Sequence, residues 1–405
     1  MRRNRPIVFF FCISSLFNMA CSFAHPVTPV LFKQLGLQDY MFGVALACMS
    51  FGNLLFSPFW GRMCSRLSSR VVMLICCMGY CVGQLLFVNA QSMLQVVCIR
   101  FCTGIFIGGV FVGLLTYVVN TAPDESIRAR WLVTQATVEA VSSAIGYFVG
   151  GMLGEISVRT SVLTQACTLA FCGLMFVLLC QSDRKTDIAP IQARTFLREV
   201  NPFRAFAQGK PILFCAMGFL MAVCALQHFN QTCFDQSFNY YAIDQLKLST
   251  GYSGAIKGSM GLVTLLANST LCVWLMKHTP IKRSVAIVFG LCSAMMALAI
   301  LQTTLVPFIV LSIVFYALNA ISVPMLRNLA ASAGRERGLD GGMVMSFYNA
   351  LKNLGGILGA LLAGFTYMAS PKTPFICCVI STFAAAAIAL VYRRKTSSQN
   401  AANHV

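Results

Sequence analysis

The chain has 405 residues, of which 58% are hydrophobic and only 10% are charged. That composition is far more apolar than that of a soluble domain of average usage, so we expect an integral membrane protein. The formal net charge of +18 would suit a nucleic-acid-binding protein. The placement of the basic residues along the chain, however, favours a membrane topology and no nucleic-acid partner.

Twelve stretches are long and apolar enough to cross a bilayer as helices, because a hydrocarbon core of about 30 Å takes about 20 helical residues. They run roughly over residues 7–31, 40–62, 71–90, 92–119, 131–154, 160–181, 211–242, 249–276, 283–303, 305–327, 341–369 and 371–392. The basic and then apolar N-terminus also fits a secretory signal. Because eleven further spans follow, we predict an uncleaved first helix.

The basic residues divide unevenly between the two sides of the membrane. If both termini face the cytoplasm, most Arg and Lys residues fall inside, from Arg2 and Arg3 at one end to Arg394 and Lys395 at the other. Those that fall outside are Lys33, Arg159, Lys247 and Lys372. This positive-inside bias predicts cytoplasmic termini and an even number of helices.

The longest hydrophilic interval divides the spans six and six. We therefore predict an all-α integral membrane fold with twelve transmembrane helices in two six-helix bundles. The predicted parts are an N-terminal bundle (1–181), a cytoplasmic linker (182–210), a C-terminal bundle (211–392) and a cytoplasmic tail (393–405).

An internal repeat supports two related bundles. "EAVSSAIGYFVGG" from Glu139 in span 5 overlays "KNLGGILGALLAG" from Lys352 in span 11, so that Gly146 meets Gly359. Small residues at such spacings let helices approach closely, and this can be their whole role. The predicted helix-packing positions are Gly104, Gly108, Gly146, Gly150, Gly151, Gly355 and Gly359.

Several charged residues fall within predicted spans. Arg100 lies about eight residues into span 4, while Glu139 and Lys352 lie ~13 Å and ~17 Å along their helices from Arg130 and Gly341. Charges at membrane depth are costly and commonly functional, although a structural ion pair is the alternative. Arg100 would be partnered by backbone carbonyls or Glu139, Glu139 by Lys352, and Asp235 by Lys257 or Lys352. The predicted charge network for proton coupling is Arg100, Glu139, Asp235, Lys257 and Lys352.

Span 7 carries the polar run "QHFNQTCFDQSFNYY", Gln227 to Tyr241. Its polar residues recur at offsets of three and four, as one face of a helix requires, which predicts the wall of a water-filled cavity. His228 would titrate near neutral pH or pack as a hydrogen-bonded side chain. The predicted substrate-cavity residues are Asn18, His25, Gln227, His228, Asn230, Gln231 and Asn239.

Three stretches resemble signature motifs of the major facilitator superfamily, in its twelve-helix drug:proton antiporter branch. They are "GRMCSRLSSR" (Gly61 to Arg70), "RFCTGIFIGG" (Arg100 to Gly109) and "GYFVGG" (Gly146 to Gly151). "NRPIV", "PVTP", "IRAR" and "NPFRAF" are similar to tetracycline and multidrug exporters of that branch. The resemblance implies a cytoplasmic gate motif at Gly61, Arg62, Arg66 and Arg70, for which membrane anchoring is the alternative, and a part in proton coupling for Arg100.

The chain also departs from these motifs. Ser65 and Ser68 stand where the loop motif has an acidic residue and a glycine, and Tyr147 stands where the antiporter motif has proline. Phe17 and Asn18 lie where tetracycline exporters have an intramembrane aspartate.

We therefore predict a secondary transporter that works by alternating access and exports a small organic, drug-like compound by proton coupling. A transporter of a polar metabolite such as a sugar is the alternative, because span 7 is polar. A membrane enzyme is less favoured because the four histidines are scattered, and the cysteines have helical spacing without a neighbouring histidine. We expect no cofactor and no metal, protons as the coupling ion, a monomer, and a multi-pass location in a bacterial inner membrane.

Overall fold

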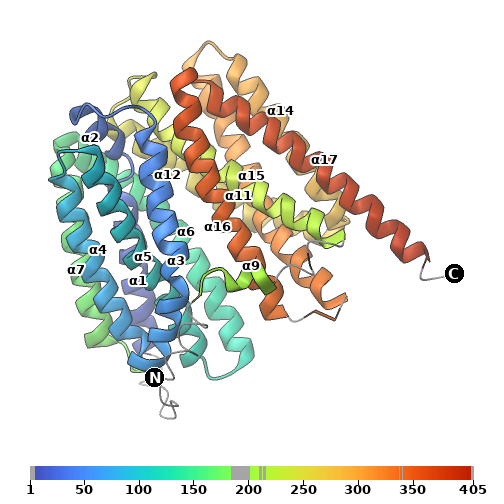
Figure 1. Ribbon diagram of the computed structural model, residues 1–405, viewed down its shortest axis with the longest axis horizontal. Helices are drawn as coiled ribbons and strands as arrows, with labels where there is room; N and C mark the ends of the chain where they lie inside the picture. The colour runs from blue at the N-terminus through green and yellow to red at the C-terminus, as the bar shows by residue number, and fades with distance from the viewer. Residues whose placement is uncertain are drawn as a thin grey trace. The chain divides into compact units, whose positions relative to one another are not determined.

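A computed structural model describes residues 5–183, 201–208, 212, 216–336, 338–339 and 341–402, and the regular structure within them is helical (Figure 1). The first part contains α1 (Arg5–Phe23), α2 (Thr28–Gln34), α3 (Met41–Leu67), α4 (Ser69–Val88), α5 (Met93–Thr121), α6 (Glu125–Ile156) and α7 (Val158–Leu179). The second part contains α9 (Arg204–Gln208), α11 (Ala216–Asp244), α12 (Thr250–Ala267), the π-helix η2 (Asn268–Cys272), α13 (Val273–His278), α14 (Ile281–Leu301), α15 (Leu305–Glu336), α16 (Gly341–Ala369) and α17 (Thr373–Ala402).

Within the described residues, 10 helical segments are long and apolar enough to cross a membrane. This finding confirms the prediction of an all-helical, multi-pass membrane protein. The helices α11 and α16 lie at two further predicted spans but are outside that set of segments. The count of twelve spans and the cytoplasmic termini therefore stay predictions, and residues 184–200 and 209–210 of the predicted linker lie outside the described ranges.

The chain divides into two compact units. Unit 1 consists of Met1–Met41, Cys48–Pro202 and Ala242–Gly261, and unit 2 consists of Phe42–Ala47, Phe203–Tyr241 and Leu262–Val405. Each unit thus holds mainly one half of the sequence together with a short piece of the other half.

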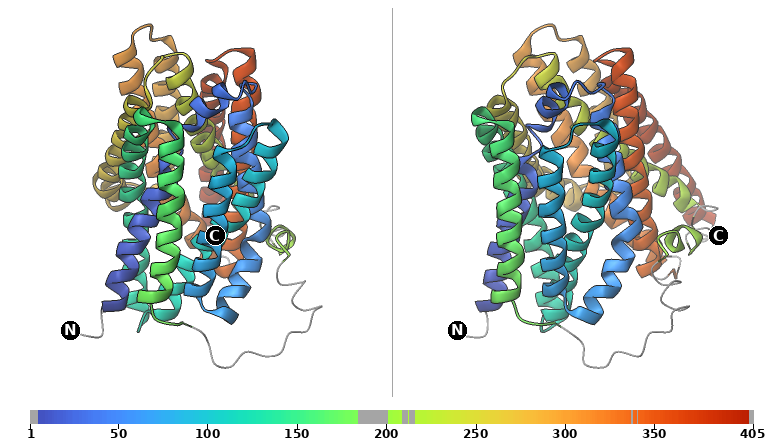
Figure 2. Two further views of the ribbon diagram at one scale, coloured as in Figure 1. Left: turned by 90° about the vertical axis from the view of Figure 1, so that its left-hand side faces the viewer. Right: turned by 60° about the vertical axis from the view of Figure 1, so that its left-hand side comes forward.

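Unit 1 is held together by a buried apolar core. Here α4 packs against α5 and α7, while α1 packs against α6 and α7, and these helices run beside one another in both views of Figure 2. Phe10 stacks on Tyr117 with ring centroids 4.5 Å apart and also contacts Phe176. Aromatic pairs of this kind stabilise a core beyond the area that they bury.

Unit 2 has a core of its own, in which α14 packs against α15 and α17. Phe234 and Phe238 of α11 are fully buried. Phe234 contacts Phe315 and Phe375, and Phe238 stacks on Phe308. Phe234 and Phe238 of the polar run are therefore turned into the packed interior of this unit.

Two predicted spans are not single α-helices. The first breaks between Phe23 and Thr28, because Pro26 lacks the N–H that a continuing helix would use. The eighth contains the π-helix Asn268–Cys272, where the hydroxyls of Ser269 and Thr270 bond back to carbonyl oxygens one turn earlier. At the C-terminus, α17 continues through Arg393 to Ala402, so the predicted tail begins as a helix.

Glycines on α6 and α16 allow equivalent close helix contacts in the two units. On α6, a Cβ added at Gly146 or Gly150 would overlap the carbonyl oxygen of Met19 or Phe23 of α1. On α16, a Cβ at Gly355 or Gly359 would overlap the carbonyl oxygen of Ala225 or Phe229 of α11. We call these two contacts the paired seams.

Candidate functional site

A buried polar cluster joins α1 to α6 inside unit 1. Ser14 Oγ donates to Gln135 Oε1 at 3.1 Å, and Asn18 Nδ2 donates to the carbonyl oxygen of Ser14 at 2.8 Å. Two turns further along α6, the hydroxyls of Ser15 and Ser142 lie 2.7 Å apart. Asn18 is 1% exposed, so in this structure it belongs to a helix contact and not to an open surface.

Glu139 lies between the two α6 residues of that cluster. It follows Gln135 by four residues and precedes Ser142 by three, which places all three on one side of the helix. Gln135 and Ser142 are buried, whereas Glu139 is exposed. The Glu139 carboxylate thus lies near the middle of the 32-residue apolar helix α6, beside the polar contact between α6 and α1.

Arg100 is buried in unit 1 with 7% exposure. Its guanidinium carbon lies 3.5 Å from the centroid of the Phe87 ring, and no ion pair with a carboxylate is seen for it among the described residues. An aromatic face attracts a cation through its quadrupole, most strongly where water is absent. The structure therefore provides an aromatic partner for Arg100 instead of the carbonyl or carboxylate that we expected.

His25 lies in the turn between α1 and α2 and stacks on Tyr147 of α6, with ring centroids 5.3 Å apart. Tyr147 occupies the place where the antiporter motif has proline. Tyrosine keeps the backbone N–H that proline lacks, and α6 runs without a break from Glu125 to Ile156. The departure from the motif thus gives an unbroken helix and an aromatic contact with the end of α1.

The first half of α12 packs on α6 within unit 1, at positions where both helices have small residues. A Cβ at Gly254 would overlap the carbonyl oxygen of Tyr147. Glu155, at the end of α6, accepts a hydrogen bond from the backbone N–H of Gly251 at 2.6 Å. A carboxylate there stabilises the N-terminus of α12. Lys257 lies farther along α12 and is 4% exposed.

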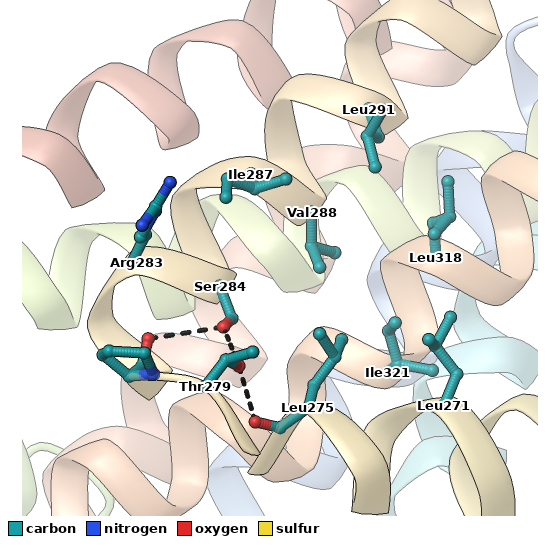
Figure 3. Close-up of a pocket in the computed structure, with 11 residues that line it drawn as sticks. Leu271, Leu275, Thr279, Arg283, Ser284, Ile287, Val288, Leu291, Leu318 and Ile321 are labelled. Carbon is teal, nitrogen blue, oxygen red and sulfur yellow. Dashed lines mark hydrogen bonds between the residues drawn. The ribbon is translucent and has the colours of Figure 1, made fainter.

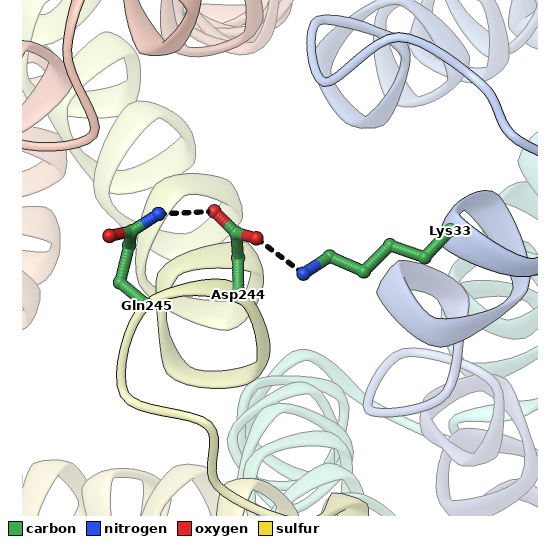
Figure 4. A network of polar contacts seen from close by, with 3 residues as sticks. All are labelled: Lys33, Asp244 and Gln245. Atoms are coloured by element: carbon green, nitrogen blue, oxygen red, sulfur yellow. Dashed lines mark hydrogen bonds and ion pairs between the residues drawn. The ribbon is translucent and has the colours of Figure 1, made fainter.

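Asp244, the last residue of α11, forms an ion pair that is not part of the predicted charge network. Lys33 of α2 pairs with Asp244, whose other oxygen accepts a hydrogen bond from Gln245 Nε2 at 2.7 Å (Figure 4). Both partners belong to unit 1. They are partly exposed, and an exposed pair stabilises a fold by about 0–1 kcal/mol.

In unit 2, part of the polar run forms a chain of hydrogen bonds with α15. Asn319 Nδ2 donates to Gln231 Oε1 at 2.9 Å, and Gln231 Nε2 donates to Asp235 Oδ2 at 3.1 Å. Gln227 Nε2 reaches the carbonyl oxygen of Asn319 at 3.5 Å. Gln227 is buried, whereas Gln231 and Asp235 are half-buried.

The other polar residues of α11 point elsewhere. Asn230 is buried against α17, where it accepts a hydrogen bond from Ser381, and Asn239 is also buried. His228 is half-buried, and a Cβ at Gly356 of α16 would lie 3.1 Å from its Cδ2. The polar run therefore does not form one uniform face.

The predicted charge network is divided between the units. Arg100, Glu139 and Lys257 lie in unit 1, whereas Asp235 and Lys352 lie in unit 2. The pairings of Glu139 with Lys352 and of Asp235 with Lys257 stay predictions.

The predicted gate motif lies at the end of α3 and the start of α4. Gly61 has room for a Cβ, with Val112 at 3.8 Å as its neighbour, and Arg62 and Arg66 are half-buried. Arg70 donates to the carbonyl oxygen of Cys180 at 3.0 Å, which ties the start of α4 to the end of α7.

Asp183 follows α7 and binds the turn between α3 and α4. Its carboxylate accepts hydrogen bonds from Ser68 Oγ at 2.8 Å, Ser69 N at 2.7 Å, Ser69 Oγ at 2.6 Å and Asn120 Nδ2 at 3.0 Å. Ser68 has a φ of 82°, a conformation that side chains with a Cβ rarely adopt and that explains the glycine of the resembling motif. The carboxylate thus holds a non-glycine residue in a glycine conformation.

Substitutions of Ser68 separate the hydrogen bond from the backbone strain. We expect Ser68→Ala to lower the unfolding free energy by about 1.5–3 kcal/mol, because a hydrogen bond to a charged group is lost. Ser68→Gly loses the same bond but relieves about 1–3 kcal/mol of strain, so it should cost clearly less. Thermal unfolding of the two purified variants measures the difference, and equal losses would show that the positive φ stores no strain.

Sequence reasoning missed several of these residues. Gln135 could have been found, since it precedes Glu139 by one helical turn. The pairing of Ser14 with Gln135, the contact of Glu155 with α12 and the role of Asp183 join residues far apart in the chain. No local pattern indicates them.

The chain is similar to a known protein family and to several known proteins. A family model described as the Major Facilitator Superfamily matches residues 10–342. Multidrug resistance protein 1 of Bacillus subtilis (strain 168) is 23% identical over 375 residues, which are 91% of each chain. The quinolone resistance protein NorA of Staphylococcus aureus (strain MRSA252) is 22% identical over 167 residues, 41% of this chain and 43% of NorA.

Solved structures show the same fold at lower identity. A bacterial homologue of the human lysosomal transporter Spinster has a TM-score of 0.76 and 13% identity, covering 97% of both chains. The nucleoside transporter NupG has a TM-score of 0.73 and 15% identity, covering 96% of this chain and 98% of its own.

Proposed function

The chain belongs to the Major Facilitator Superfamily, and on that premise we propose that it exports a small organic, drug-like compound in exchange for protons. It would work by alternating access, as a monomer in the inner membrane of a bacterium, with both termini in the cytoplasm. The names of relatives such as multidrug resistance protein 1 and NorA support export of drug-like compounds. The excess of Arg and Lys on one side of the predicted spans supports the orientation.

The observation that carries the proton coupling is the placement of Glu139. An exposed carboxylate halfway along a membrane helix can take up or release a proton when its surroundings change. The neighbouring contacts of Gln135 and Ser142 hold α6 against α1, so the carboxylate has a fixed position within unit 1. Glu139 is therefore the residue that we assign to proton exchange.

Transport by proteoliposomes tests the proposal. Sealed vesicles with an imposed pH gradient and a pH-sensitive dye would be given cationic drugs, sugars and organic acids in turn. Proton movement that depends on one of these compounds supports a coupled transporter, and the compound that responds identifies the substrate class. If none of them moves protons while the protein is folded, proton-coupled transport of these three classes of compound is refuted.

Arg100→Ala should reduce this substrate-dependent proton movement strongly, because it removes the buried cation from the Phe87 ring. The matched control is Arg159→Ala, which removes an exposed arginine from the start of α7. Arg100→Lys keeps the charge but loses the planar guanidinium, and it should retain part of the activity. Full activity of Arg100→Ala in the same assay would exclude Arg100 from the coupling.

A polar metabolite such as a sugar is the second candidate substrate. The observation that favours it is the chain of amides and carboxylate through Asn319, Gln231 and Asp235, since such groups can bind hydroxyl-rich ligands. The sugars in the transport panel decide between the two candidates.

A further inference from the structure

A groove lies in unit 2, and its lining includes none of the residues assigned to transport. It is a cavity of about 330 Å³ between α14, α15 and the segment that runs from η2 through α13. One end is lined by Leu271, Leu291 and Leu318, whereas the other end holds Arg283, Thr279 and Ser284 (Figure 3). The groove is therefore apolar along its length and polar at one end.

The length of the groove matches one leaflet of a bilayer. Along α14, the rise from Arg283 to Leu291 is about 12 Å, and the opposite wall from Thr279 back to Leu271 rises by the same amount. One leaflet of hydrocarbon is about 15 Å deep. Ile287 and Leu291 are 50% and 45% exposed, so the groove is open to the hydrocarbon along its side.

The polar end has a defined structure. Thr279 Oγ1 donates to the carbonyl oxygen of Leu275 at 2.6 Å and lies 2.5 Å from Ser284 Oγ. Arg283, which precedes Ser284, is exposed and lines the same groove, and Lys277 and Lys282 lie nearby in the sequence. These three cations belong to the side that the positive-inside bias makes cytoplasmic, where anionic lipids attract basic residues.

We propose that this groove binds an anionic phospholipid of the cytoplasmic leaflet. One acyl chain lies between α13 and α14, and the phosphate pairs with the Arg283 guanidinium, which can bind it through two hydrogen bonds. The positive charge of Arg283 selects an anionic headgroup, and the apolar side chains of the groove hold the acyl chain. The proposal does not depend on the substrate or on proton coupling.

The test is native mass spectrometry of the full chain in detergent, titrated with phosphatidylglycerol or with phosphatidylcholine of the same acyl chains. We expect phosphatidylglycerol to bind in preference, and Arg283→Gln to weaken it about fivefold, as expected for one cation at a membrane surface. The matched control Arg335→Gln removes an exposed cation at the end of α15 and should change nothing.

A second variant tests the apolar part. Ile287→Trp fills the groove from its exposed side and should weaken both lipids, whereas Ile380→Trp, at a 63% exposed position of α17, should not. Equal binding of the two lipids by the wild type, or unchanged binding by both Arg283→Gln and Ile287→Trp, would overturn the proposal. If free glycerol phosphate binds as well as phosphatidylglycerol, the site recognises an anion without its lipid and the proposal is also wrong.

Discussion

Glu139→Gln is expected to reduce substrate-dependent proton movement to the level of vesicles without protein, while the chain remains folded. Glutamine has nearly the same shape as glutamate but cannot exchange a proton in this pH range. The side chain is exposed between two buried polar contacts of α6, so the substitution leaves the packing of α6 on α1 intact. Dye-reported proton flux and thermal unfolding of the same preparation measure the two expectations.

The control for this experiment is Glu125→Gln. Glu125 lies in the first turn of the same helix, is exposed and pairs with Arg128 one turn along. Its substitution removes an equal charge from α6 at a membrane surface and should leave transport unchanged. Wild-type coupling in the Glu139→Gln variant would remove Glu139 from the mechanism, whereas equal losses in both variants would indicate a general effect of charge.

Gly104→Ala should have the largest effect on stability of the substitutions considered for this chain. The added Cβ would overlap the carbonyl oxygen of Met49, which is backbone and cannot rotate away, so α5 and α3 must move apart. Overpacking of a dense interior usually costs about 1–3 kcal/mol and more where the backbone has to shift. We expect a clear drop in the thermal unfolding temperature in detergent, or failure to accumulate.

Gly290→Ala provides the matched comparison, because no atom lies within 4 Å of a Cβ added there. Gly290 is also inside a membrane helix, α14. Alanine at this position should be neutral or stabilising, by up to about 1 kcal/mol of helix propensity. If the two variants unfold at the same temperature, the close approach at Gly104 is not needed for stability.

The helical spans were the most predictable part of the structure. Their hydrophobic length follows directly from the bilayer thickness, and helices are found at every predicted span. Pro26 indicates the helix break after Phe23, but a prediction from hydropathy alone does not take proline into account. The π-helix at Asn268–Cys272 depends on side chains that bond to their own backbone, and Ser or Thr in a membrane helix usually does this without changing the helix type.

The sequence predicted how far along their helices the candidate site residues lie, but not which residues they contact. The sequence placed Glu139 near the middle of its helix, yet the contact of Gln135 with Ser14 depends on how two helices pack. Arg100 shows the same limit, because nothing local to span 4 distinguishes the ring of Phe87 from a carboxylate as its neighbour. In α11, spacing suggested one polar face, but the residues divide between α15 and α17 because Asn230 faces a different helix from Gln231.

The paired seams show how the two halves of this chain differ at matching positions. Gly146 meets Met19 in one half and Gly359 meets Phe229 in the other, so Met19 and Phe229 are counterparts. The residues before them, Asn18 and His228, are then counterparts as well. The matching position therefore serves different contacts in the two halves: Asn18 donates to the carbonyl oxygen of Ser14 within unit 1, whereas His228 is half-buried beside Gly356 of α16 in unit 2.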